Sequence, residues 1–231
     1  MLDIRVSSQR GRGKFSWLDS KHSFSFADYY DANRMGFASL RVINDDTVSP
    51  GAGFDTHGHR DMEIISYVTQ GEIIHKDSQG HHQRLPAGEF QLMSAGKGIY
   101  HSEFNPSQSE SLKFLQIWIQ PDTVGGEPSY QQKHFKQTQA IKAIVSPTGE
   151  NGTLKIKQDA YLYRLSLVAQ EQTRYETEPQ RKLYVHLIDG ELMLEGKLLK
   201  AGDGAAITNV DKLDIIAHKE SGVSGLIFDM A

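Results

Sequence analysis

Hydrophobic and polar residues alternate over short stretches of this chain, and glycine, proline, asparagine and aspartate interrupt them at short intervals. Period-two patterns between turn residues are typical of β-strands, and many short strands with few helical periods indicate a sandwich or barrel. We therefore predict an all-β protein. The predicted strands are residues 38–43, 63–69, 73–75, 90–93, 99–104 and 112–119, with a half-buried strand at Phe24 and Phe26 and a turn at residues 44–46.

The second half of the chain repeats features of the first. Residues 70–73 (QGEI) correspond to 189–192 (DGEL), and residues 86–89 (PAGE) correspond to 200–203 (KAGD). Such internal similarity indicates a duplicated structural unit. A polar stretch at residues 120–133, with glycine and proline, marks the best boundary. We predict two tandem antiparallel β-barrels, an N-terminal domain of residues 1–130 and a C-terminal domain of residues 131–231.

Composition excludes several function classes. The net charge is −4, which argues against a nucleic-acid or anionic-membrane partner. The N-terminus has no apolar signal-peptide core, and no stretch has 18 consecutive apolar residues, so we expect neither export nor a membrane span. The chain has no cysteine, which removes disulfides and thiolate ligands and is compatible with the cytoplasm, where we expect the protein.

Two residue pairs point to metal chemistry. His57 and His59 form an i, i+2 pair, and so do His101 and Glu103. Alternate residues of a strand face the same side, roughly 6.6–7 Å apart. Two such pairs on neighbouring strands would bring three imidazoles and a carboxylate to one point, a ligand set that suits Fe, Zn, Ni, Mn or Cu. We therefore predict one divalent transition metal ion in the N-terminal barrel.

The repeat offers a test of this prediction. Counting the same offsets from the glycines of the second copy gives Glu176 and Glu178 for the first pair, and Ile215 and Ala217 for the second. No histidine stands at these positions, so we expect the two glutamates to be solvated and the metal to lie in the N-terminal barrel only. Within that barrel, His75 is a candidate for supporting a ligand. Gln116 faces the cavity or hydrogen-bonds within its strand.

The motifs around these pairs resemble the cupin superfamily. The first motif runs from Gly51 through the two histidines to Glu63 and Gly71, and the second from Gly88 through His101 to Asn105. The stretches 22–46, 57–68 and 87–107 are similar to the pirin family within that superfamily. This resemblance spans nearly the whole chain, and it implies a bicupin, that is, two jelly-roll barrels of the cupin type, with a degenerate second barrel.

In pirins the metal is held by the histidines of the first pair and by the histidine and glutamate of the second, which implies His57, His59, His101 and Glu103 here. A typical cupin uses the glutamate of the first motif instead, here Glu63. Spacing favours Glu103, because Glu63 lies four residues after His59, roughly 13 Å along an extended chain, and needs a turn to return. We expect Glu63 behind the ligands, where it would orient a ligand or a bound water.

The resemblance also implies a reaction. Bacterial pirins of this type are similar to quercetin 2,3-dioxygenases, so we expect Fe(II), with Ni, Mn, Cu, Zn or Co as alternatives, a flavonol-like substrate, O₂ and release of CO. Glu103 is the candidate base for the substrate hydroxyl. Phe54, Met93, Phe114 and Ile117 are candidates for the pocket wall, and we expect a monomer.

Two other functions fit the same ligands. One is a regulatory binding protein without turnover, whose interaction surface responds to the oxidation state of iron. The other is a cupin enzyme, an isomerase or a dioxygenase, that acts on another catechol-like substrate. The sequence does not separate these alternatives from the flavonol dioxygenase.

Overall fold

The computed structural model describes residues 1–218 and 220–231. The regular elements of these residues are β-strands, apart from two short 3₁₀ helices, η1 (Ser7–Gln9) and η2 (Glu150–Gly152). The strands belong to two compact units. The N-terminal unit comprises Gly11–Phe135 and Ile156–Gln158; the C-terminal unit comprises Met1–Arg10, Lys136–Lys155 and Asp159–Ala231.

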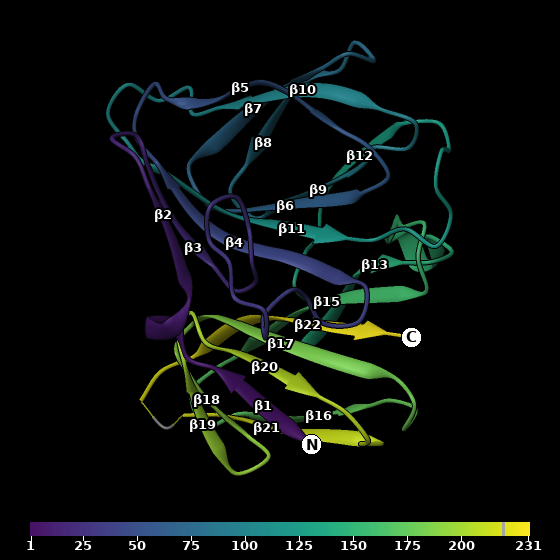
Figure 1. The fold of residues 1–231 in the computed structure, drawn as a ribbon. Helices are drawn as coiled ribbons and strands as arrows, with labels where there is room; N and C mark the ends of the chain where they lie inside the picture. Colours follow the sequence, from purple (N-terminus) through teal and green to yellow (C-terminus); the bar gives the residue numbers. More distant parts are fainter. Residues whose placement is uncertain (219) are drawn as a thin grey trace. The chain divides into compact units, whose positions relative to one another are not determined.

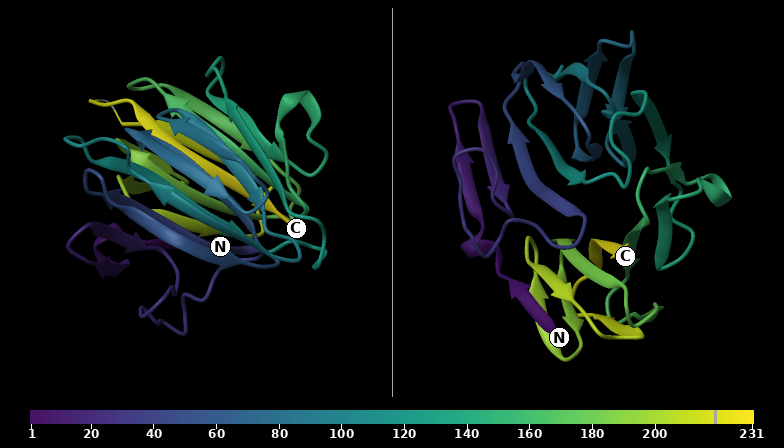
Figure 2. Two further views of the ribbon diagram at one scale, coloured as in Figure 1. Left: turned by 90° about the horizontal axis from the view of Figure 1, so that it is seen from above. Right: turned by 45° about the vertical axis from the view of Figure 1, so that its right-hand side comes forward.

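The N-terminal unit contains two antiparallel sheets, seen as separate layers in Figure 1. The order in the seven-stranded sheet is β12 (Ser129–His134), β9 (Glu89–Ser94), β6 (Glu63–Gln70), β11 (Leu112–Ile119), β4 (Leu40–Val48), β3 (Leu18–His22) and β2 (Gly11–Lys14). The order in the four-stranded sheet is β5 (Gly53–His59), β10 (Ile99–Phe104), β7 (Glu72–Asp77) and β8 (His82–Pro86). The hairpin of β2 and β3, purple in Figure 2, lies beside β4.

The C-terminal unit has the same plan. Its seven-stranded sheet has the order β1 (Leu2–Arg5), β20 (Gly204–Ile207), β17 (Lys182–Asp189), β22 (Val223–Met230), β15 (Ala160–Leu167), β13 (Ile141–Ser146) and β14 (Leu154–Lys155). Its four-stranded sheet has the order β16 (Gln172–Glu176), β21 (Lys212–Ala217), β18 (Glu191–Leu194) and β19 (Lys197–Lys200). The duplication predicted from the sequence is therefore visible as two units of seven and four strands.

Alternation of side chains explains where each core lies. In the C-terminal unit, Leu183, Val185 and Leu187 of β17 join Leu213 and Ile215 of β21 in one buried cluster. Smaller clusters lie in the N-terminal unit, and two of them contain residues predicted for the pocket wall. One contains Leu18, Val48, Val68, Ile73, Leu85, Leu112 and Phe114; the other contains Ile64, Met93, Ala95 and Ile99.

Several predicted elements are present. Strands at residues 99–104 and 112–119 are confirmed, and the turns at Gly71 and Gly88 have the left-handed backbone that glycine allows, with φ of 79° and 89°. The predicted turn at residues 44–46 is wrong, because these residues lie inside β4. The predicted strand at Phe24 and Phe26 is also wrong, because β3 ends at His22.

The division of the chain differs from the predicted one at both ends of the N-terminal domain. The first strand, β1, pairs with β20, so Met1–Arg10 belong to the C-terminal unit. Residues 129–134, part of the predicted boundary, form β12, which pairs with β9 in the N-terminal unit. Both differences come from pairing between distant segments, which a local pattern does not reveal.

No helix among the described residues has the length and apolar character needed to cross a membrane.

Candidate metal centre

The two residue pairs predicted from the sequence lie on adjacent strands, β5 and β10. His57 and His101 are direct cross-strand partners. Beyond them the register shifts, and Glu103 lies opposite Phe54. Cross-strand partners share a face of the sheet, and this bulge re-aims the residues that follow it. As a result, the side chains of both pairs project from the same side of the four-stranded sheet.

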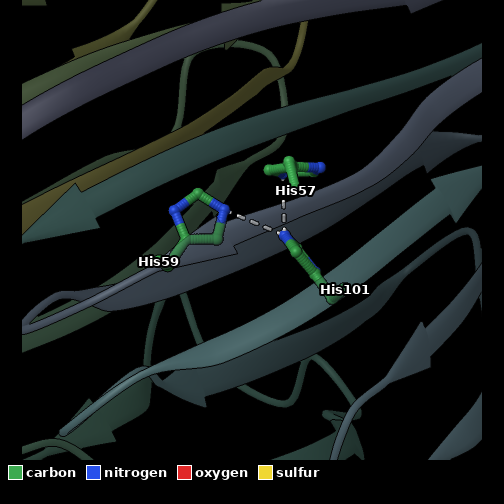
Figure 3. Close-up of side chains that lie close together, drawn as sticks. All are labelled: His57, His59 and His101. Carbon is green, nitrogen blue, oxygen red and sulfur yellow. Dashed lines mark hydrogen bonds between the residues drawn. The ribbon is translucent and has the colours of Figure 1, made fainter.

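The three imidazoles converge on one point, as Figure 3 shows. His101 Nε2 lies 3.0 Å from His57 Nε2 and 3.0 Å from His59 Nε2. These three residues form a group whose ligand atoms are all within 4.8 Å of one another. Two nitrogens that each bind one metal at about 2.1 Å, at right angles, lie about 3.0 Å apart. The nitrogen spacing therefore fits a shared cation.

Hydrogen bonds to the other ring nitrogens leave lone pairs at this point. His57 Nδ1 lies 2.7 Å from the Asp55 carbonyl oxygen, which only accepts, so Nδ1 carries the proton and Nε2 is unprotonated. A second orienting contact acts on His101, whose Nδ1 lies 3.5 Å from His75 Nδ1. Because His75 donates its Nε2 proton to Asp77, at 3.0 Å, its Nδ1 is an acceptor for the His101 Nδ1 proton. With these tautomers the Nε2 atoms of His57 and His101 face each other at 3.0 Å with their lone pairs, an arrangement that a shared cation would satisfy.

Burial supports the neutral imidazoles. Burial first, and then the charge of the neighbouring imidazoles, lowers the pKa of His59 to about 4 and that of His101 to about 3. Asp77 anchors the supporting hydrogen bonds. Burial raises the pKa of Asp77, but hydrogen bonds from His75 and His81 outweigh burial and lower it, so this carboxylate stays ionised. An orienting carboxylate behind a histidine is the usual support for a metal ligand.

Glu103 lies beside the histidines and is held by two other side chains. It is almost fully buried, with 3% of its surface exposed. Gln116 Nε2 donates to Glu103 Oε2 at 3.0 Å, and Ser66 Oγ lies 3.3 Å from Oε1. The ligand atoms of Glu103 lie close to those of His75 and His101, and these three residues form a second candidate set beside the three histidines. The position of Glu103 as the fourth ligand thus remains a prediction. Of the two alternatives for Gln116, the structure shows the first, because Gln116 lines the cavity.

Glu63 has hydrogen-bond partners outside the two residue pairs. It is the first residue of β6 and accepts hydrogen bonds from Ser94 Oγ, at 2.8 Å, and from the backbone N–H of Lys157, at 3.2 Å. Burial raises its pKa, and these two donors oppose that rise. These contacts fix residues 156–158 to the unit, and a role of Glu63 behind the ligands stays a prediction.

The histidines open into a cavity of about 820 Å³ within the N-terminal unit. His57, His59 and Glu103 line it, and so does Phe54, as predicted. Met93, Phe114 and Ile117 are not among its lining residues, because Met93 and Phe114 pack in the two apolar clusters and Ile117 faces the other side of β11 from Gln116. Sequence reasoning missed Trp118, whose ring contacts that of His59 at 5.0 Å between centroids. Trp118 lies two residues after Gln116, and this spacing indicates that both side chains are on the same face of β11.

Among the described residues, both groups that could hold a metal ion lie in the N-terminal unit. The predicted solvated positions of the second copy, Glu176 and Glu178, are exposed. Ile215 and Ala217 are buried in the apolar cluster. Tyr175 of β16 packs against that cluster. Glu176, the position obtained by counting back from Gly190, lies on the opposite face of the strand.

Comparison with known proteins identifies relatives over the full length. The family model "Pirin" matches residues 3–119, and the model "Quercetinase C-terminal cupin domain" matches residues 143–230. "Quercetin 2,3-dioxygenase" of Escherichia coli K12 is 44% identical over 230 residues, which cover 100% of this chain and 99% of that protein. A "Pirin-like protein" of Caulobacter vibrioides is 39% identical, with 96% and 97% covered.

Solved structures agree with this relationship. The crystal structure of YhhW from E. coli superposes with a TM-score of 0.97 at 44% identity, covering 100% of this chain and 98% of that one. The structure of bacterial pirin YhhW in complex with nickel(II) gives a TM-score of 0.95 at 43% identity, with 100% and 99% covered. On the matching family model and the full-length identity, the chain belongs to the pirin family.

Proposed function

We propose that this protein is a metal-dependent dioxygenase that cleaves the heterocyclic ring of flavonols such as quercetin with O₂ and releases CO. The observation that carries the proposal is the convergence of three imidazole nitrogens, 3.0 Å apart in two pairs, at the wall of a cavity of about 820 Å³. The name of the E. coli relative, 44% identical over its whole length, supports the same reaction. We also infer that the two sheets of each unit form an open barrel of the cupin type.

His57, His59, His101 and Glu103 would hold the metal. We propose Fe(II), because histidines combined with a carboxylate are the ligands of non-haem Fe(II) oxygenases. The nickel(II) complex of E. coli YhhW shows that a relative takes up a divalent metal. When bound, the metal would supply a positive charge that stabilises the deprotonated hydroxyl of the substrate, and the oxyanion would make the ring electron-rich toward O₂.

Glu103 is positioned to receive the proton. Its carboxylate borders the cavity, and Gln116 and Ser66 hold its two oxygens in place. As the flavonol enters, its 3-hydroxyl O–H bond breaks and the proton moves to a carboxylate oxygen of Glu103. Because neighbouring hydrogen-bond donors already fix the carboxylate, the reorganisation free energy of this proton transfer is small.

Aromatic side chains would bind the substrate and exclude water. Phe54 and Trp17 contact each other edge to face at 5.0 Å, and Phe26 and Trp118 do so at 5.4 Å. All four line the cavity. Flat apolar walls suit a planar aromatic substrate, and water excluded by them would leave the Glu103 carboxylate less screened.

Aerobic quercetin turnover tests the proposal. The protein is reconstituted with Fe(II), and loss of quercetin absorbance and release of CO are followed for wild type and for His57→Ala. We expect metal-dependent CO release that disappears in the variant. A metal-loaded wild-type protein that produces no CO would reject the dioxygenase and leave a binding role for the site.

A further inference from the structure

The cavity has a second polar group on its wall, apart from the histidines. It consists of Ser20 on β3 and Asn44 and Asp46 on β4. Their side chains are buried, with 2%, 3% and 3% of their surface exposed. Polar residues in the middle of buried strands cost stability unless they find partners, so their presence here asks for an explanation.

The strand register connects this group to the candidate centre. Asn44 lies directly opposite Gln116, the residue that donates to Glu103. Asp46 lies two residues further along β4, opposite Ser20. Neighbouring strands are about 4.8 Å apart, and cross-strand partners share a face, so a band of polar side chains continues from Gln116 across β4 to β3.

The chemistry of the group is that of a hydrogen-bond acceptor. Asn44 Oδ1 and Ser20 Oγ are buried and have no hydrogen-bond partner among the described residues. An amide oxygen accepts only, a hydroxyl accepts or donates, and the carboxylate of Asp46 adds an acceptor. A ligand that satisfies Asn44 Oδ1 and Ser20 Oγ must bring donors such as phenolic hydroxyls.

We propose that Ser20, Asn44 and Asp46 form a subsite that binds the hydroxyl groups at one end of a planar polyphenol, whose other end reaches Glu103. The inference rests on the proposed function, since the ligand is the hydroxylated flavonol of that reaction. The aromatic walls between the two ends hold the rings, and the subsite sets the preference for ring hydroxylation.

A pair of ligands separates the subsite from the rest of the cavity. Affinities for quercetin and for 3-hydroxyflavone, which lacks the other ring hydroxyls, are measured on metal-loaded protein by quenching of the fluorescence of Trp17 and Trp118. Wild type should favour quercetin by about tenfold or more, the effect of one or two hydrogen bonds. In Asn44→Leu, quercetin affinity should fall about tenfold while affinity for 3-hydroxyflavone stays within about twofold, which removes the preference.

Two further variants complete the design. Ser20→Ala removes only one hydroxyl group. If Asn44→Leu does not fold, the preference for quercetin can still be measured in Ser20→Ala. Asp46→Asn is matched by Asp45→Asn, the same charge change at the adjacent residue of β4, which is not among the cavity-lining residues. We expect the preference for quercetin to fall in Ser20→Ala and Asp46→Asn and to persist in Asp45→Asn.

The outcomes distinguish this inference from the proposed function. Loss of the preference in the variants, together with no CO release by metal-loaded wild type, would support the subsite and reject the dioxygenase. Turnover by variants that keep the full preference would support the dioxygenase and reject the subsite, which then holds only water. Equal affinity of wild type for the two ligands would also reject the subsite.

Discussion

The two units each combine a seven-stranded and a four-stranded sheet but use the space between their sheets differently. In the N-terminal unit, β10 presents His101 and Glu103 to the interior; in the C-terminal unit, β21 presents Leu213, Ile215 and Ala217. The described residues of the C-terminal interior form one large apolar cluster, whereas those of the N-terminal interior form smaller clusters and a cavity lined by both aromatic and polar side chains. One architecture therefore serves as a packed core in one unit and as a candidate site in the other.

The comparison indicates that the N-terminal unit loses folding stability by having a cavity with polar groups. A buried histidine or carboxylate has to be desolvated, and a cavity forgoes the packing that a filled core gains. His75, Asp77, Ser66 and Gln116 hydrogen-bond around the candidate ligands, which offsets part of this cost. The predictions below probe this contrast by changing one unit while the other serves as control.

The largest effect is expected at Glu103. If it takes the substrate proton, Glu103→Gln should lower kcat about 10²- to 10⁴-fold. Glu63→Gln should leave kcat within a few-fold, because Glu63 bonds to Ser94 and Lys157 rather than to the candidate ligands. Steady-state turnover of the metal-loaded variants measures both, with Glu176→Gln in the C-terminal unit as control. Equal losses at Glu103 and Glu63 would contradict the assignment.

A packing change in the C-terminal unit should act on stability alone. Ile215 is fully buried in the apolar cluster, so Ile215→Ala should lower the free energy of unfolding by about 2–4 kcal/mol. Chemical denaturation followed by circular dichroism measures this loss. Metal affinity of the folded variant should match wild type, and a weakened metal site would show that the units are not independent in this respect.

The carboxylate behind His101 should have an intermediate effect. Asp77→Asn weakens the hydrogen bond that orients His75, and through it His101, so metal affinity should fall about 10- to 100-fold. Titration with Ni(II) measures the affinity. Asp214→Asn, at an exposed carboxylate of β21, is the matched control. An unchanged affinity in Asp77→Asn would mean that His101 is oriented by packing alone.

A smaller effect is expected from pH on the metal-free protein. The pKa values of His59 and His101 are lowered to about 4 and about 3, against about 6.5 in the unfolded chain. Between these values the unfolded state binds protons that the folded state does not, so stability is lost as pH falls from 6.5 toward 4 and 3. Melting temperatures of wild type should therefore fall more steeply than those of the double variant His59→Asn/His101→Asn. Parallel pH profiles would contradict the lowered pKa values.

The sequence revealed the centre more readily than the cavity. His57, His59 and His101 were predictable because alternate residues share a strand face and glycine turns bracket each pair. The local pattern at Asn44 and Asp46 predicts a turn, since polar residues in a buried strand are explained only by a cavity that faces them. Glu63 has a suitable parity, but the turn before β6 sets its direction, and Asp61 in that turn has a positive φ of 50°.

Long-range pairing was also beyond the sequence. The pairing of β1 with β20 joins segments about 200 residues apart, and β2 and β3 carry Gly13 and His22 to the cavity wall from a stretch without a metal motif. Local patterns specify that such segments are strands, but the sheet edge that each one meets depends on the whole fold.

The most direct test of the central claim is the stoichiometry of metal binding. Calorimetric titration of the metal-free protein with Ni(II) should give one site per chain. The site should be absent from the double variant His57→Ala/His59→Ala and retained in Glu176→Ala/Glu178→Ala, the corresponding change in the second copy. Retention of the metal by the histidine variant, or its loss from the glutamate variant, would contradict a single centre in the N-terminal unit.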